Sequence, residues 1–144
     1  MRNVVLVLCL LFVAYVHSQD WQSDFRTAMQ KAKVEEKLVL LVFSGSDWCA
    51  PCIRLDRNIW QSDAFKSYAT DHFVLYKADF PRKKKNALPE KKMQSNRDLA
   101  ELYNPNGHFP WVLVLNEHQK ILGTISFQNQ TSNEYIELLA GYVR

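Results

Sequence analysis

The stretch that most constrains the fold is GSDWCAPC, residues 45–52, which follows directly on the apolar run LVLLVF, residues 38–43. A run that is apolar throughout predicts a strand covered on both faces by helices. Residues 49–60 then predict a helix, with Ile53 and Leu55 to Ile59 on its inner side. The Cys-x-x-Cys pair therefore stands at a strand-to-helix junction.

The rest of the chain alternates between the same two kinds of element. Helices are predicted over 21–36 and, after a break at Ser62, over 63–69; a strand over 73–78 follows. Next come a long surface loop over 79–96, a short helix over 97–103, and strands over 111–116 and 121–127. A last helix begins with a Thr131–Glu134 capping box and is expected to bury Ile136, Leu139, Ala140 and Val143. Strands that alternate with helices predict an α/β fold, a sheet with helices on both faces. The length of 144 residues predicts a single domain, and 47% hydrophobic residues is an ordinary globular composition.

Residues 1–18 are expected to be a signal peptide that is removed, which leaves one domain over residues 19–144. The start MRN is positive, residues 4–16 form an apolar core, and Ser18 ends a cleavage site. This apolar run, which contains Cys9, is shorter than the about 20 residues that a helix needs to cross a bilayer, although a retained anchor is an alternative. After export, only Cys49 and Cys52 remain, in a compartment where disulfides can form.

Three uses of this cysteine pair compete: redox chemistry, metal binding and a structural crosslink. A structural disulfide normally joins distant residues, because a loop this short constrains the unfolded chain very little. A closed zinc site needs four ligands, and the pair supplies two. Both observations favour redox chemistry.

The position of Cys49 in the first helical turn favours its thiolate, because free backbone N–H groups and the positive end of the helix dipole face it there. Cysteines in such motifs have pKa values between roughly 3.5 and 7.5, against about 8.5 for a free thiol. Pro51 suits this turn, since its missing N–H would have no helical partner. Cys52 lies one turn further in and is expected to be better shielded. Asp47, if close to the sulfur, would oppose the effect by raising the pKa of Cys49.

The segment FSGSDWCAPC after a buried strand, with Pro110 just before a later strand, resembles the thioredoxin superfamily. The resemblance is strongest to exported thioredoxin-like proteins of Gram-negative bacteria that carry a GSDWCxxC variant, and it extends from about residue 20 to residue 144. It implies a thioredoxin-like fold, a central mixed sheet flanked by helices on both faces. In that fold we expect strands 111–116 and 121–127 to run antiparallel to the strand before Cys49.

The resemblance also implies roles for individual residues. Cys49 corresponds to the nucleophile and Cys52 to the resolving cysteine of a redox-active disulfide. The supporting residues would be Trp48 beside the motif, Ala50 and Pro51 between the cysteines, and Phe109 with the cis-proline Pro110 opposite them. The backbone of Phe109 would be free to pair with an extended substrate segment. No cofactor and no metal are expected.

The sequence departs from the family at Phe43, where thioredoxins usually carry a buried aspartate that moves protons to the resolving thiol. Proton transfer must then use water or another group, and Asp47 and Glu36 are weak candidates. The dipeptide between the cysteines is Ala-Pro instead of the commoner Gly-Pro. It keeps the proline that accompanies reducing members of the family, which favours a reductase.

We therefore predict a monomeric thiol–disulfide oxidoreductase that reduces disulfides of exported proteins and is recharged by a thiol electron donor, for which a membrane-bound protein is a candidate. The periplasm is the expected compartment, with secretion or membrane anchoring as alternatives, and no stable membrane insertion is expected once the signal is removed. The alternatives in function are a disulfide oxidase or isomerase, or a soft-metal carrier that adds His108 to the two sulfurs.

The basic run at residues 82–85 could attract acidic partners, but a solvated loop is the favoured interpretation. Nucleic acid is not expected as a partner. The net charge of +3 is small, and no aromatic residues interleave with the lysines.

Overall fold

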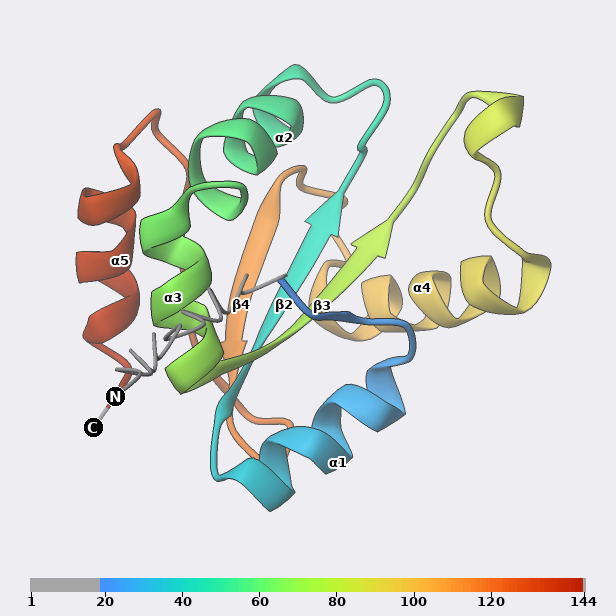
Figure 1. The fold of residues 1–144 in the computed structure, drawn as a ribbon. Coiled ribbons are helices and arrows are strands. Elements are labelled where there is room, and N and C mark those ends of the chain that lie inside the picture. The colour runs from blue at the N-terminus through green and yellow to red at the C-terminus, as the bar shows by residue number, and fades with distance from the viewer. Residues whose placement is uncertain (1–18, 144) are drawn as a thin grey trace, which may run out of the picture.

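The computed structural model describes residues 19–143, which fold around a sheet of five strands (Figure 1). The expected signal peptide, residues 1–18, lies outside the described residues. The elements are β1 (Trp21–Gln22), α1 (Phe25–Glu35), β2 (Leu38–Ser44), α2 (Ala50–Leu55), the π-helical turn η1 (Asp56–Trp60), α3 (Asp63–His72), β3 (Phe73–Asp79), the 3₁₀ turn η2 (Lys84–Asn86), α4 (Glu90–Tyr103), β4 (Trp111–Leu115), β5 (Ile121–Thr124) and α5 (Ser132–Ala140). Within residues 19–143, none of these helices is long and apolar enough to span a membrane.

The strand order is β1-β3-β2-β4-β5, and the sheet is mixed, as predicted. β1 and β2 both pair with β3 in parallel, whereas β4 pairs antiparallel with β2. β5 in turn pairs antiparallel with β4, so it runs parallel to β2. The expectation that both of the last two strands oppose β2 was therefore wrong for β5. β4 and β5 form a hairpin, so β5 runs opposite to β4 and in the same direction as β2.

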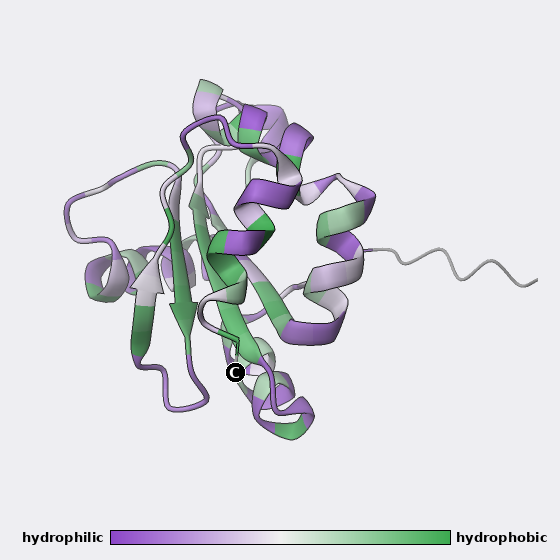
Figure 2. Ribbon diagram, turned by 90° about the vertical axis from the view of Figure 1, so that its left-hand side faces the viewer, coloured by the Kyte–Doolittle hydropathy of each residue, from purple (hydrophilic) through white to green (hydrophobic). Residues whose placement is uncertain are grey.

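The sheet is covered on both faces, because successive side chains of each strand point to opposite sides. One set, which includes Leu40 and Val42 of β2, packs against α2, η1, α3 and α5. The other set, which includes Leu41 and Phe43, packs against α1 and α4. Figure 2 shows the hydrophobic strands lying between helices whose outer surfaces are hydrophilic. The uninterrupted apolar run of β2 is thus explained by burial on both sides.

The helix after β2 continues from α2 into η1, and Ser62 then separates it from α3, as predicted. The Ser62 side chain accepts the N–H of Phe65 and so caps α3. Leu55 and Ile59 are buried as expected, and Trp60 is buried with them. The expectation was wrong for Ile53, which is 44% exposed, and for residues 57 and 58, which are also exposed. A helix turns only every third or fourth residue towards the core, so a continuous run of inner residues does not fit on one face.

Several boundaries differ from the prediction: α3 extends to His72, β5 ends at Thr124, and the start of the first helix and the start of α4 are displaced. Trp21 lies on β1 rather than on the first helix. This strand was not predicted because two residues are too few to show the alternation typical of a strand. Helix α4 begins at Glu90, inside the stretch predicted to be a loop. Its buried positions are Asn96 and Leu99, and an amide at one of them hides the apolar periodicity that signals a helix.

The last helix has the predicted capping box, in which the Thr131 side chain accepts the N–H of Glu134 and the Glu134 carboxylate accepts the N–H of Thr131. Its fully buried residues are Tyr135 and Leu139. The other residues expected to be buried are less so: Ile136 and Val143 are partly buried, and Ala140 is exposed.

Candidate active site

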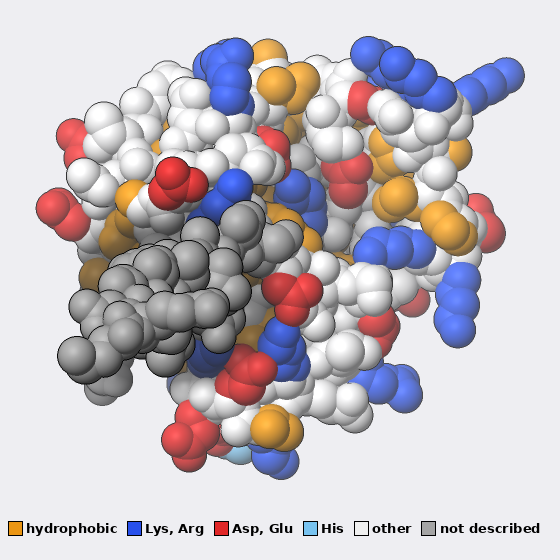
Figure 3. Space-filling view, in the orientation of Figure 1, with side chains coloured by type: hydrophobic (Ala, Val, Ile, Leu, Met, Phe, Trp, Pro, Cys, Tyr) orange, Lys and Arg blue, Asp and Glu red, His pale blue; other side chains and the backbone are white. Residues whose placement is uncertain are grey.

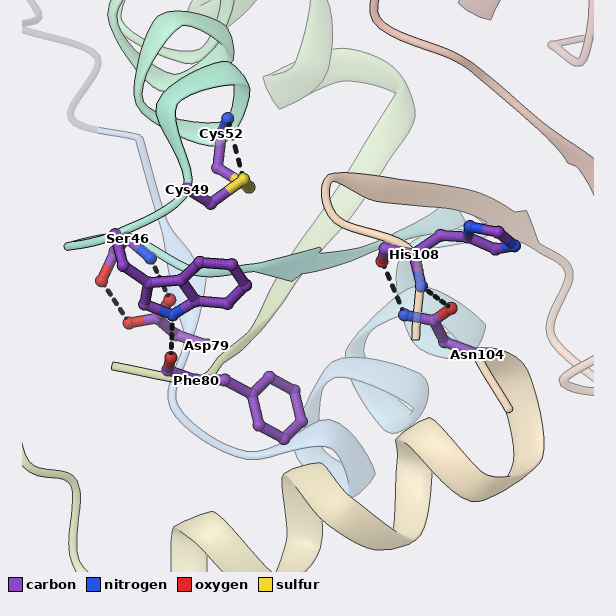
Figure 4. Close-up of a disulfide and its surroundings, with 8 residues drawn as sticks. Ser46, Cys49, Cys52, Asp79, Phe80, Asn104 and His108 are labelled. Carbon is purple, nitrogen blue, oxygen red and sulfur yellow. Dashed lines mark hydrogen bonds between the residues drawn. A yellow bond between two sulfur atoms is a disulfide. The ribbon is translucent and has the colours of Figure 1, made fainter. Parts of the chain in front are cut away.

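Cys49 and Cys52 form a disulfide at the carboxyl end of β2, where the chain enters α2 (Figure 4). Cys49 is the N-cap residue of α2, and its sulfur accepts the backbone N–H of Cys52 at 3.3 Å. The predicted position of the pair, at a strand-to-helix junction, is therefore confirmed. An N–H donated to sulfur stabilises an anion on it, so this contact favours a thiolate on Cys49 once the disulfide is reduced.

The two cysteines differ little in accessibility. Cys49 is 5% exposed and Cys52 is 3% exposed in the disulfide form. The expected order is present, but the difference is too small to decide which sulfur reacts first. The hydrogen bond from Cys52 to the Cys49 sulfur distinguishes the two cysteines more clearly than exposure does.

Trp48 forms one wall of the site. Its indole Nε1 donates to the carbonyl oxygen of Phe80 at 2.7 Å, and its ring meets the ring of Phe109 edge-on, with 5.4 Å between centroids. The guanidinium of Arg82 lies over the indole, 3.7 Å from its centroid. Gly45 leaves room for the ring, since a Cβ at this position would lie 2.3 Å from the indole. The sequence predicted the place of Trp48 beside the motif but not the Arg82 contact.

Phe109 and Pro110 are joined by a cis peptide bond, as the resemblance implied. Phe109 contacts both Trp48 and Phe80, which places this segment beside the disulfide. Within residues 19–143, neither the N–H nor the C=O of Phe109 takes part in a hydrogen bond. The backbone at Phe109 is thus available to an incoming chain.

Asn104 holds the segment that leads to Phe109. Its buried side chain donates to the carbonyl of His108 at 2.8 Å and accepts the N–H of the same residue at 2.9 Å. A second buried amide, Asn96, accepts the hydroxyl of Tyr76 and donates to the carbonyl of Asp79. Neither amide was predicted, although an asparagine at a position that should be apolar is a signal of such a buried hydrogen-bonding role.

Asp79 connects the end of β3 to the loop before the cysteines. Its carboxylate accepts both the backbone N–H and the hydroxyl of Ser46 (Figure 4). Together with Asn96, this pair ties the ends of β2 and β3 together beneath Trp48. No local pattern indicates this contact, because Ser46 and Asp79 are far apart in the chain.

His108 does not approach the sulfurs with its ring. The imidazole is exposed and stacks on Trp111, with 5.2 Å between centroids, and Figure 4 shows it directed away from the disulfide. Within the described residues, no group of three His, Cys, Asp or Glu side chains could hold a metal ion. The imidazole therefore does not join the two sulfurs in one site, as the soft-metal alternative requires.

Asp47 is bound to the loop that joins β3 to α4. Its carboxylate accepts the backbone N–H groups of Arg82 and Lys83 and the side-chain amide of Asn86, at 2.9 to 3.0 Å. These hydrogen bonds, led by that from Arg82, lower the pKa of Asp47 to about 2. A carboxylate with so low a pKa is a poor proton acceptor at neutral pH.

Glu36, the other proton-transfer candidate, lies at the wrong end of the sheet. It caps the end of α1 just before β2 begins, whereas the cysteines follow the end of β2. A seven-residue strand separates them by about 20 Å. Phe43, in place of the usual aspartate, is fully buried and pairs with Trp111.

Comparisons with known proteins agree with this arrangement. The family model of thioredoxin-like proteins matches residues 20–116. A Chlamydia pneumoniae protein named disulfide bond reductase DsbH is 34% identical over 117 residues, which cover 81% of this chain and 68% of the relative. The thioredoxin-related protein DsbJ of the same organism is 28% identical over 113 residues, 78% of this chain and 32% of that longer protein. A solved structure of a DsbH oxidoreductase superposes with a TM-score of 0.79 at 30% identity, covering 86% of this chain and 83% of the other.

Proposed function

The chain belongs to the thioredoxin-like family and is a thiol–disulfide oxidoreductase, and we propose that it works as a reductase of disulfides in exported proteins. The observation that carries the proposal is the Cys49–Cys52 disulfide at the start of a helix, where the sulfur of Cys49 accepts a backbone N–H. The name of the relative DsbH, a disulfide bond reductase, supports the direction.

In the proposed reaction the dithiol form of the protein acts first. The Cys49 thiolate attacks one sulfur of the substrate disulfide, forms a mixed disulfide and releases the other substrate sulfur as a thiolate, which takes up a proton. Cys52 then loses its proton and attacks Cys49. The second substrate sulfur leaves, and two electrons have passed to the substrate. The protein is left as the Cys49–Cys52 disulfide, the form that the structure contains.

The residues around the disulfide support this exchange in different ways. Trp48 and Phe109 provide aromatic contact beside the sulfurs, and the unbonded backbone of Phe109 can receive an extended substrate segment as an added strand. Ala50 and Pro51 form the connection between the cysteines, which the ring of Pro51 stiffens at the start of α2. Pro110 follows Phe109, whose ring contacts Trp48.

The proton released by Cys52 goes to water in this proposal. Phe43 cannot accept it, Asp47 is held ionised by the loop that it binds, and Glu36 is at the far end of β2. We expect resolution of the mixed disulfide to respond to pH through the thiols themselves, since none of these three residues can take up the proton beside the sulfurs.

The reducing direction requires an electron donor, because an exported compartment such as the periplasm is kept oxidising. We propose that the donor is another thiol protein, with a membrane-bound one as the natural candidate. Export through residues 1–18 as a signal peptide, a periplasmic location and a monomeric state belong to the same proposal.

Substrate trapping tests the exchange reaction. In a Cys52→Ser variant the mixed disulfide cannot resolve, so substrates should remain covalently attached to Cys49 when the variant is made in its own host. The double variant Cys49→Ser/Cys52→Ser is the control. Recovery of the same proteins with both variants, or of none with either, would show that Cys49 does not exchange with protein disulfides.

The reduction potential tests the direction. A reductase should have a potential near that of thioredoxin, about −270 mV, whereas a strong oxidant lies near about −120 mV. Equilibration with glutathione at defined ratios, followed by alkylation of free thiols, measures the value. A potential near the upper figure would overturn the reductase assignment and leave the oxidoreductase activity in place.

A further inference from the structure

The segment that joins β3 to α4, here called the basic loop (residues 80–89), carries four consecutive cationic side chains at residues 82–85. All four are exposed. In the part of the chain that the structure describes, none of them forms an ion pair. From the sequence alone this run is a solvated loop with no particular position.

The structure places the loop against the active site and fastens it there. Asp47, two residues before Cys49, binds the backbone N–H groups of Arg82 and Lys83 and the side chain of Asn86. The loop residue Phe80 accepts the indole N–H of Trp48. Arg82 stacks on the outer face of the same indole. These contacts fix the backbone of the loop against Asp47 and Trp48, the residues just before Cys49.

The positive charge of the loop is only partly offset by its neighbours, of which Asp47 carries a negative charge close to Lys83. The Asp47 carboxylate is bound by uncharged N–H groups rather than by a cationic side chain. Asp79 is bound by Ser46, and Glu90 at the start of α4 pairs with Arg97. In Figure 3 basic side chains project at the upper right, where Figure 1 places the loop between β3 and α4. A cationic rim thus borders the aromatic wall of the site.

We propose that the basic loop docks an acidic segment that flanks the disulfide of a protein substrate, a specificity that rests on the proposed reductase function. The substrate chain would run past Phe109, whose backbone is unbonded, and present its acidic side chains to Lys83, Lys84 and Lys85. A polypeptide is the partner that fits, because the cationic rim adjoins Trp48, the residue next to the sulfur that must meet a disulfide. Opposite charges across such a rim mainly increase the rate of productive encounter.

Two synthetic peptides can test the docking. Both contain the same intramolecular disulfide, flanked by glutamates in one and by glutamines in the other. The reduced protein transfers two electrons to either peptide and becomes the Cys49–Cys52 disulfide. We expect the glutamate peptide to be reduced about fivefold to tenfold faster at low salt, and the preference to shrink as ionic strength rises.

Matched variants separate the loop from the net charge of the protein. Lys83→Gln/Lys84→Gln/Lys85→Gln should abolish the preference without changing the rate with the glutamine peptide. The control Lys33→Gln/Lys66→Gln/Lys120→Gln removes the same charge from side chains on α1, α3 and the β4–β5 turn. It should keep most of the preference.

The outcomes distinguish this inference from the function on which it rests. Equal rates with the two peptides, or an equal loss of preference in both triple variants, would overturn the docking role and leave the reductase standing. Failure to reduce either peptide would overturn the reductase and the docking role together. If only binding to vesicles with anionic lipid depends on the loop lysines, the loop faces a membrane and the inference is wrong.

Discussion

Replacing Gly45 by alanine tests how the aromatic wall of the site is built. Gly45 lies between β2 and α2, and its carbonyl accepts the N–H groups of Trp48 and Cys49. A Cβ on Gly45 would lie 2.3, 2.5 and 2.7 Å from three atoms of the Trp48 indole. These separations are far below van der Waals contact, so the indole must move away.

The loss of stability in Gly45→Ala follows from the contacts that the Trp48 indole loses when it moves. Forcing a methyl group into a packed site costs about 1–3 kcal/mol. Displacement also weakens the hydrogen bond from Trp48 to Phe80, worth about 1 kcal/mol, and the edge-on contact with Phe109, worth about 0.5–1.5 kcal/mol. Because these losses overlap, we expect Gly45→Ala to lower the free energy of unfolding by about 2–4 kcal/mol.

Urea unfolding of the disulfide form measures this change, and two other glycines supply controls. Gly141→Ala meets its nearest atom, the carbonyl oxygen of Leu138, at 3.4 Å and should be close to neutral. Gly123→Ala would contact Tyr142 at 2.2 Å, on β5 and away from the disulfide. Gly123→Ala should lower the stability without slowing disulfide reduction. Gly45→Ala should lower the stability and also slow the reduction. Unchanged stability in Gly45→Ala would refute the packing argument.

Three further predictions concern the surroundings of the disulfide. Asn104→Ala leaves the backbone N–H and C=O of His108 without their side-chain partner. We expect the free energy of unfolding in urea to fall by about 1–3 kcal/mol and disulfide reduction to become slower. An unchanged reduction rate would contradict the role of Asn104 in positioning the segment that leads to Phe109. The pKa of Asp47 is lowered to about 2, so its contribution to stability should be complete above pH 4 and be lost as the pH falls through about 2. Acid titration of the tryptophan fluorescence, to which Trp48 contributes, should show this step, and Asp47→Asn should lack it. His108→Ala should change the reduction rate by less than about twofold, since its ring points away, and a larger effect would place the ring in the reaction.

The sequence was sufficient for the parts of the site that are close together in the chain. The buried run before GSDWCAPC, the helix after it and the break at Ser62 all follow from local pattern, and the structure has them. The family resemblance supplied what spacing could not, the pairing of Phe109 and Pro110 with the motif.

The parts that escaped prediction depend on contacts between distant residues. Asp47 was interpreted through its neighbour in the chain, Cys49, but its partners lie more than thirty residues later in the basic loop. Local pattern carries no information about such pairs. Asn96 shows a second cause, because a buried polar residue breaks the apolar period and moved the predicted start of α4.

The titration of Cys49 in the reduced protein tests the central claim most directly. The rate of alkylation by iodoacetamide, followed from pH 4 to pH 10 with Cys49→Ser as the blank, reports the fraction of thiolate. We expect a midpoint below about 7.5, since the start of α2 and the Cys52 N–H stabilise the anion. A midpoint at or above about 8.5, the value of a free thiol, would contradict the account.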